Sequence, residues 1–143
     1  MNSLLLQVQK LLFIPYKWGG NSPIEGLDCS GLVCELMRSV GEIPFRADMS
    51  AQQLFDHFAA GRGEFNRQGL GSLVWFGDSV TKITHVAMMI DNYQMVEAGG
   101  GSSQILTRED ASKAGAMVRI RLLDSRSDRV AVIKPYYRRI GMV

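Results

Sequence analysis

One cysteine and one histidine could carry nucleophilic chemistry in this sequence. Cys29 follows a loop rich in Gly, Asn, Ser and Pro, and it opens an apolar run that is typical of a helix. Because unpaired N–H groups at a helix start favour an anion, we expect a lowered pKa for the Cys29 thiol, which suits covalent attack. His85 lies in an otherwise apolar strand pattern. It is either a buried structural group or the base that a thiol requires, and the upstream cysteine favours the base.

The second histidine and the second cysteine are interpreted as structural. His57 is flanked by aromatic residues on a predicted helix, and we expect it to be half-buried at the surface. Cys34 lies five residues after Cys29, which turns it about 140° away on a helix and predicts a core thiol. The sequence has neither a Cys/His spacing typical of zinc nor a Gly-rich phosphate loop, so we expect no cofactor.

Three short segments form a combination that is more specific than any one of them. In chain order they are Tyr-Lys-Trp-Gly-Gly at 16–20, Asp-Cys-Ser-Gly-Leu at 28–32 and His-Val at 85–86. On these segments, the first 100 residues resemble the NlpC-type cell-wall cysteine peptidases. The resemblance implies a papain-like α+β fold, in which the helix of the cysteine packs on an antiparallel sheet that carries the base.

The resemblance also implies a role for each matching residue. Cys29 is the nucleophile and His85 is the base, while the Tyr16 hydroxyl and the backbone N–H of Cys29 hold the oxyanion. Without the motif, Tyr16 would be interpreted as a loop aromatic packed on the core. The implied substrate is a peptidoglycan stem peptide, cut through an acyl-enzyme at an amide that involves D-glutamate or diaminopimelate.

Three further residues of these segments are candidates for substrate binding. Asp28 and Ser30 flank the nucleophile, and in many relatives these positions help to bind the free amine of a stem peptide. Both residue types also suit the cap of a helix, and the two interpretations are compatible. Trp18 either lines the substrate groove or packs the loop.

The third residue of the site departs from the family pattern. The family places His, or else Asn or Gln, on the strand after the base, where this sequence has Glu97. A carboxylate could accept the second ring N–H of His85, although a solvent-facing glutamate at a strand end is the alternative. A two-residue loop would put Glu97 on the wrong face. We therefore predict a three-residue loop at 91–93, or an equivalent bulge, which opposes Ala87 to Glu97 and leaves Glu97 diagonal to His85.

The elements that position these residues follow from caps and periodicity. Helices come first and consecutive strands later, which predicts an α+β fold with an antiparallel sheet in a single domain spanning 1–143. Asp28, Ser50 and Thr107 are predicted helix caps. The predicted helices are 3–12, 29–40, 50–60 and 107–113, and the predicted strands are 72–76, 83–90, 93–98, 117–123 and 130–134.

Composition favours one soluble domain. The 143 residues are 46% hydrophobic and 21% charged, which suits a real core and excludes disorder. No apolar run reaches the roughly 18 residues that cross a bilayer, so no transmembrane segment is expected. The N-terminal stretch lacks the features of a signal peptide. We therefore expect a cytoplasmic protein, or one that a phage tail or a secretion machine delivers to the cell wall.

Positive charge gathers at the C-terminal end. Residues 117–143 carry seven basic and two acidic residues, a net charge of +5 that leaves −3 for the first 116. A basic region could steer the domain to anionic polymers, membranes or an acidic partner, and a phage-tail or secretion partner would engage it here. The preferred interpretation is a solvated strand face with a frayed end. No nucleic-acid partner is expected.

Two other functions stay open at this point. A noncatalytic phage-tail or wall-binding assembly module on the same fold would keep the motifs without the reaction. An amidase or acyltransferase on other amides would have a mostly apolar groove without an anchor for a peptide amine.

Overall fold

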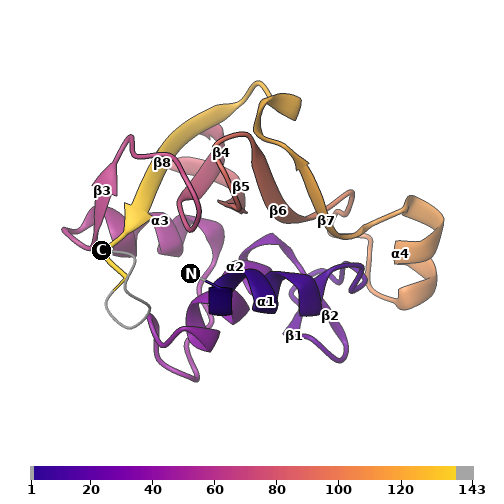
Figure 1. Ribbon diagram of the computed structural model, residues 1–143. Helices are drawn as coiled ribbons and strands as arrows, with labels where there is room; N and C mark the ends of the chain where they lie inside the picture. Colours follow the sequence, from indigo (N-terminus) through magenta and orange to yellow (C-terminus); the bar gives the residue numbers. More distant parts are fainter. Residues whose placement is uncertain (1, 138–143) are drawn as a thin grey trace.

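The computed structural model describes residues 2–137, and in it a six-stranded antiparallel sheet arches over a layer of helices (Figure 1). The strand order is β3-β8-β4-β5-β6-β7, and a separate ribbon pairs β1 (Asn21–Ser22) with β2 (Gly26–Leu27). The strands of the sheet are β3 (Gly63–Phe65), β4 (Leu73–Ser79), β5 (Lys82–Met89), β6 (Gln94–Gly99), β7 (Met117–Leu122) and β8 (Arg129–Pro135). The predicted α+β fold with an antiparallel sheet is confirmed.

The helices begin where the sequence predicts them. Asp28 caps α2 by accepting the N–H of Gly31 at 2.7 Å, while Ser50 and Thr107 each form a capping box at the start of α3 and α4. In Figure 1, α1 and α2 lie beneath the sheet and α4 projects at one end of the molecule. The helices are α1 (Asn2–Leu11), α2 (Cys29–Ser39), α3 (Ala51–Ala59) and α4 (Arg108–Ala114).

The sheet buries side chains on both of its faces, as the alternation along β5 shows. Val86 and Met88 belong to the main core, which they share with the helices. Ala87 and Met89 point the other way and pack in a second, smaller cluster. Leu123, in the short 3-10 helix Leu123–Ser125 between β7 and β8, packs in this second cluster. The segment that connects the edge strand β7 to β8, inside the sheet, therefore covers the face opposite the helices.

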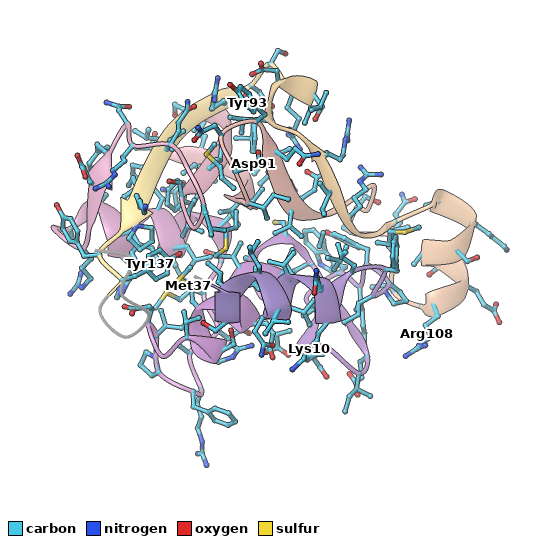
Figure 2. All side chains as sticks on the ribbon, viewed as in Figure 1. Lys10, Met37, Asp91, Tyr93, Arg108 and Tyr137 are labelled. Carbon is cyan, nitrogen blue, oxygen red and sulfur yellow. The ribbon has the colours of Figure 1, made fainter. Side chains whose placement is uncertain are left out.

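The hairpin between β5 and β6 decides the face on which Glu97 lies. Its loop consists of residues 91–93, and Asp91 closes it by accepting the N–H groups of Tyr93 and Gln94 at 2.7 Å (Figure 2). The register that follows pairs Met88 with Val96. The predicted three-residue loop is therefore confirmed.

The same hairpin opens beyond its last pair. Continued by one residue, the register sets Ala87 across from Glu97, as predicted, but the ladder already ends at Met88 and Val96. From there β5 pairs only with β4, and β6 pairs only with β7. The two strands that carry the predicted base and its partner thus separate at the level of the candidate site.

The shortest elements escape sequence analysis. Strands β1, β2 and β3 have two or three residues each, which is too short for a hydrophobic period to show. Two members of the predicted basic tail, Arg138 and Arg139, lie outside the described residues. At the end of the described chain, Tyr137 donates to the carbonyl of Gly71 at 2.6 Å and lies against Met37 of α2 (Figure 2). None of the helices within residues 2–137 has the length and apolar character to cross a membrane.

Candidate active site

Cys29 is the first residue of α2, as the sequence predicts, and a carboxylate locks the preceding loop to it. Asp28 accepts the N–H of Gly31 at 2.7 Å through Oδ1 and the N–H of Gly19 at 3.1 Å through Oδ2. A Cβ at position 31 would overlap the carbonyl oxygen of Gly20, which accepts the N–H of Asp28 at 3.0 Å. Only glycine therefore allows the loop to approach the helix start this closely.

The predicted lowering of the pKa of Cys29 is wrong. Burial raises the pKa of this thiol to about 11. The N–H groups of Val86 and Ser30 offset only part of that rise, and the negative charge of Asp28 adds to it. Loss of water around the sulfur thus outweighs the helix start, so the thiol is neutral at neutral pH and needs a base to lose its proton.

His85 is buried on β5 and is held by a carboxylate on the next strand. Its Nε2 lies 2.9 Å from Oε1 of Glu97. The ring also packs against Phe76, its cross-strand partner on β4, with the ring centroids 5.6 Å apart. These contacts fix the plane of the imidazole and leave Nδ1 as the ring nitrogen that Glu97 does not engage.

Glu97 is 1% exposed, so the alternative of a solvent-facing glutamate is wrong. Its second oxygen, Oε2, lies 3.2 Å from Nε of Arg119 and 3.6 Å from Nη1 of Arg121. Burial alone would raise the pKa of this carboxyl, but the hydrogen bonds and charges of His85 and Arg119 outweigh burial and lower it. Glu97 is therefore an ionised acceptor for the ring N–H of His85.

All of the candidate site residues line one cleft with a volume of about 780 Å³. Cys29 enters from the helix layer, while His85 and Glu97 enter from the sheet where β5 and β6 separate. Tyr16, Trp18, Asp28 and Ser30 also line this cleft. The structure thus brings together every residue that the sequence places in the site.

Tyr16 is buried at the wall of the cleft. Burial raises the pKa of its phenol above the ordinary value. The Cys29 thiolate, which forms only at the high pH where a phenol titrates, and the carboxylate of Asp28 raise it further. A Cβ at position 101 would overlap the Tyr16 ring, so the glycine after β6 lets the chain close over it. The phenol keeps its proton at neutral pH and can only donate a hydrogen bond to a developing negative charge.

Two candidate binding residues differ in how firmly they are held. Ser30 donates from Oγ to Oδ1 of Asp28 at 3.3 Å, which joins it to the helix cap. Trp18 is 53% exposed, and its backbone N–H donates to the carbonyl of Ile105 at 2.7 Å. Its side chain lines the cleft and does not pack in the core.

Among the residues that line the cleft, sequence analysis missed Gln52 and three arginines. Gln52 of α3 accepts the N–H of Ile83 at 3.1 Å and donates to the carbonyl of Val80 at 2.8 Å, which holds the start of β5. No motif marks this residue. The arginines belong to the basic C-terminal segment, for which a solvated strand face was expected. Arg119, Arg121 and Arg126 line the cleft instead of an open face, and their side chains are only partly exposed.

The two residues assigned structural places are found there. Cys34 is fully buried in α2. Its thiol donates to the carbonyl of Met49, and its sulfur accepts the backbone N–H of Met49, each at 3.4 Å. His57 is half-buried on α3 with its ring edge-on to Phe58. Neither residue lines the cleft.

Comparison with known proteins matches residues 14–121 to the NlpC/P60 family. The chain is 31% identical over 99 residues to murein DD-endopeptidase MepH of Escherichia coli and 33% identical over 92 residues to the bifunctional muramidase/DL-endopeptidase CwlT of Bacillus subtilis. These matches cover 68% and 63% of this chain but only 34% and 26% of the two relatives, so the chain spans about a third or less of each.

A solved structure extends the likeness to the fold. RipD of Mycobacterium tuberculosis, described as a non-catalytic NlpC/p60 domain protein adapted to peptidoglycan binding, superposes with a TM-score of 0.66 at 15% identity. The match covers 94% of this chain and 95% of that one.

Proposed function

The chain belongs to the NlpC/P60 family, and we propose that it is a cysteine peptidase that cleaves an amide bond in peptidoglycan stem peptides. One observation carries the proposal. A cysteine at a helix start and a strand histidine paired with a buried carboxylate line the same cleft, which is the constellation that acyl transfer through a thiol requires.

His85 acts as a base during the attack and not before it. The raised pKa of Cys29 keeps the sulfur protonated at neutral pH, so Nδ1 of His85 takes the proton as Sγ bonds to the scissile carbonyl carbon. Glu97 accepts the Nε2 proton and stabilises the imidazolium that forms. Tyr16 and the backbone N–H of Cys29 donate to the oxyanion.

The same groups complete the cycle. His85 returns its proton to the leaving amine as the carbon–nitrogen bond breaks, which leaves an acyl group on Cys29. His85 then takes a proton from water, whose oxygen attacks the thioester and releases the acid and the thiol. Each proton that His85 accepts is given back within the cycle.

The bond that is cut involves D-glutamate or diaminopimelate in this proposal. The two relatives act on different bonds by their names, one as a DD- and the other as a DL-endopeptidase. Asp28 and Ser30 recognise the amine of the stem peptide in addition to capping α2, and Trp18 covers the bound peptide. The exposed indole and the carboxylate beside the nucleophile support these roles.

RipD, as a non-catalytic neighbour, supports a second candidate, a module that binds the wall without cutting it. Both candidates use the same cleft, so the test must separate cleavage from binding. Purified wall fragments are incubated with the wild type or with Cys29→Ala, and the products are analysed by mass spectrometry. The wild type is expected to release new peptides, and Cys29→Ala is expected to release none.

A matched pair of histidine variants completes the test. His85→Gln is expected to abolish peptide release, whereas His57→Gln, which changes the other histidine outside the cleft, is expected to keep it. Binding of the fragments by the wild type with no release under any condition would reject the peptidase and favour the binding module.

A further inference from the structure

Three arginines form one wall of the cleft, beside the carboxylate that orients the base. Arg119 and Arg121 project from β7 on the same face as Glu97, because Arg119 pairs directly with Glu97 and Arg121 lies two residues along. Arg126 reaches the cleft from the segment that connects β7 to β8. The mechanism above needs none of these guanidinium groups to touch the substrate.

Arg119 and Arg121 of β7 keep N–H donors that Glu97 does not engage. Both guanidinium groups approach one oxygen, Oε2, while His85 occupies Oε1. Within residues 2–137, the side-chain hydrogen bonds of Arg119 run from Nε only, and Arg121 stands 3.6 Å from the carboxylate, beyond hydrogen-bond distance. A guanidinium has five N–H donors, so most of those at this wall are left for a ligand.

Arg126 is held in place as a third positive charge. Its Nε and Nη2 donate to the two carboxylate oxygens of Asp128 at 3.0 and 2.8 Å, and its guanidinium stacks on the Phe76 ring at 4.9 Å. Three arginines therefore face two carboxylates, Glu97 and Asp128, at this wall. One positive charge is left over on the surface that a substrate meets.

The cleft is also lined by a negative charge. Asp28 lies at the start of α2, next to the nucleophile, and lines the same cleft as the arginines. A cleft lined by a carboxylate and by surplus guanidinium groups suits a ligand that carries both an amine and a carboxylate. An ordinary backbone peptide in mid-chain has neither group, whereas a short stem peptide has both.

We propose that Arg119, Arg121 and Arg126 form a carboxylate-binding subsite, by which the enzyme selects stem peptides with a free carboxylate over the same peptides amidated. The proposal rests on the proposed function for its substrate class. Arg121 is the main anchor, since its ion pair with Glu97 at 3.6 Å is looser than the hydrogen bonds that hold Arg119 and Arg126. Planar guanidinium groups bind carboxylates through paired, charge-assisted hydrogen bonds, which an amide cannot form.

Three synthetic tripeptides test the subsite. They are Ala-γ-D-Glu-diaminopimelate, the same peptide with the D-glutamyl α-carboxylate amidated, and the same peptide with its C-terminal carboxylate amidated. The wild type is expected to cleave one of the amidated peptides with a kcat/KM about tenfold or more below that of the parent. The amidated peptide whose kcat/KM is lowered identifies which carboxylate the arginines bind.

Two arginine variants separate the subsite from a general effect of charge. Arg121→Gln is expected to shrink the ratio between the parent and the affected peptide toward one. Arg129→Gln removes the same charge from β8, where the side chain pairs with Asp124 at 3.7 Å outside the cleft, and is expected to keep the ratio. Equal cleavage of all three peptides by the wild type, or an unchanged ratio in Arg121→Gln, overturns the subsite.

Binding to Cys29→Ala distinguishes failure of the subsite from failure of the proposed function. Calorimetry with the three peptides reads the preference without any cleavage. A preference for the free carboxylate in this variant, with no cleavage by the wild type, supports the subsite and rejects the peptidase. Equal affinity for all three peptides, or no binding of any, rejects the subsite.

Discussion

At the residue scale, the site combines a thiol that burial keeps neutral with a carboxylate that burial does not neutralise. Cys29 has a raised pKa of about 11. Glu97 is also buried, with 1% of its surface exposed, yet its pKa is lowered because His85 and Arg119 supply hydrogen bonds and positive charge. The partners of each group, and not its depth alone, set its protonation state. In the proposed reaction, this combination makes His85 the group that moves the proton.

The state of Cys29 can be measured by its alkylation. In His85→Ala, the rate at which iodoacetamide modifies Cys29 is expected to rise with pH through a midpoint near 11, because only the thiolate reacts. Mass mapping of the modified peptide separates Cys29 from the buried Cys34. A midpoint near 8.5, the ordinary value of a free thiol, would contradict the effect of burial.

Glu97 is expected to stabilise the fold in a pH-dependent way. Because its folded pKa lies below its unfolded value of about 4.3, its ionised form contributes stability above that value, and the contribution is lost as the pH falls through the folded pKa. Urea unfolding is therefore expected to show Glu97→Gln less stable than the wild type at pH 7 and closer to it at pH 3. A difference that grows in acid would contradict the ion pairs with Arg119 and His85.

At the element scale, local signals predict most of the fold. Cap residues such as Asp28 and Ser50 place the helix starts, because the unpaired N–H groups of a first turn need a side-chain acceptor. Parity along the β5–β6 hairpin predicts that Glu97 shares a face with His85, because side chains alternate along a strand. These features depend on a few neighbouring residues and so can be derived from the sequence.

The missed features depend on contacts between distant segments. Burial of the Cys29 sulfur follows from how α2 packs on β5, and no residue of the helix start reports it. The place of Arg126 follows from the route of the chain from β7 to β8 across the sheet. In the sequence, Arg119 and Arg121 look like the solvent-facing residues of an ordinary alternating strand. Only the pairing of β7 with β6 places them beside Glu97. Long-range pairing of this kind has no local signature.

Loop length in the β5–β6 hairpin is expected to control activity. Deleting Asn92 leaves a two-residue loop, which shifts the register by one and turns Glu97 to the opposite face of the sheet. We expect kcat to fall about 100-fold or more, the range of general acid–base catalysis, with the far-ultraviolet circular dichroism retained. Asn92→Gly keeps the loop length and is the matched control. Equal activity in the two variants would show that the register does not depend on the loop.

At the scale of the whole molecule, the cleft is divided between two layers. The proposed nucleophile and its cap belong to the helices, and the proposed base with its carboxylate belongs to the sheet. Apolar packing in the main core, where Leu36 of α2 is fully buried, holds the helix layer against the sheet. The catalytic geometry is therefore expected to be lost together with the core and not before it.

Unfolding in urea tests this dependence. Leu36→Ala opens a cavity in the core and is expected to lower the free energy of unfolding by about 2–5 kcal/mol, whereas Leu6→Ala, the same substitution at a side chain 55% exposed on α1, is expected to change it by less than about 0.5 kcal/mol. Trp75 is fully buried and reports the core by fluorescence once Trp18→Phe removes the exposed indole. Peptidase activity and Trp75 fluorescence are expected to share one midpoint, which Leu36→Ala moves for both. Activity that disappears at a lower urea concentration than the fluorescence change would instead show that the cleft opens while the core stays packed.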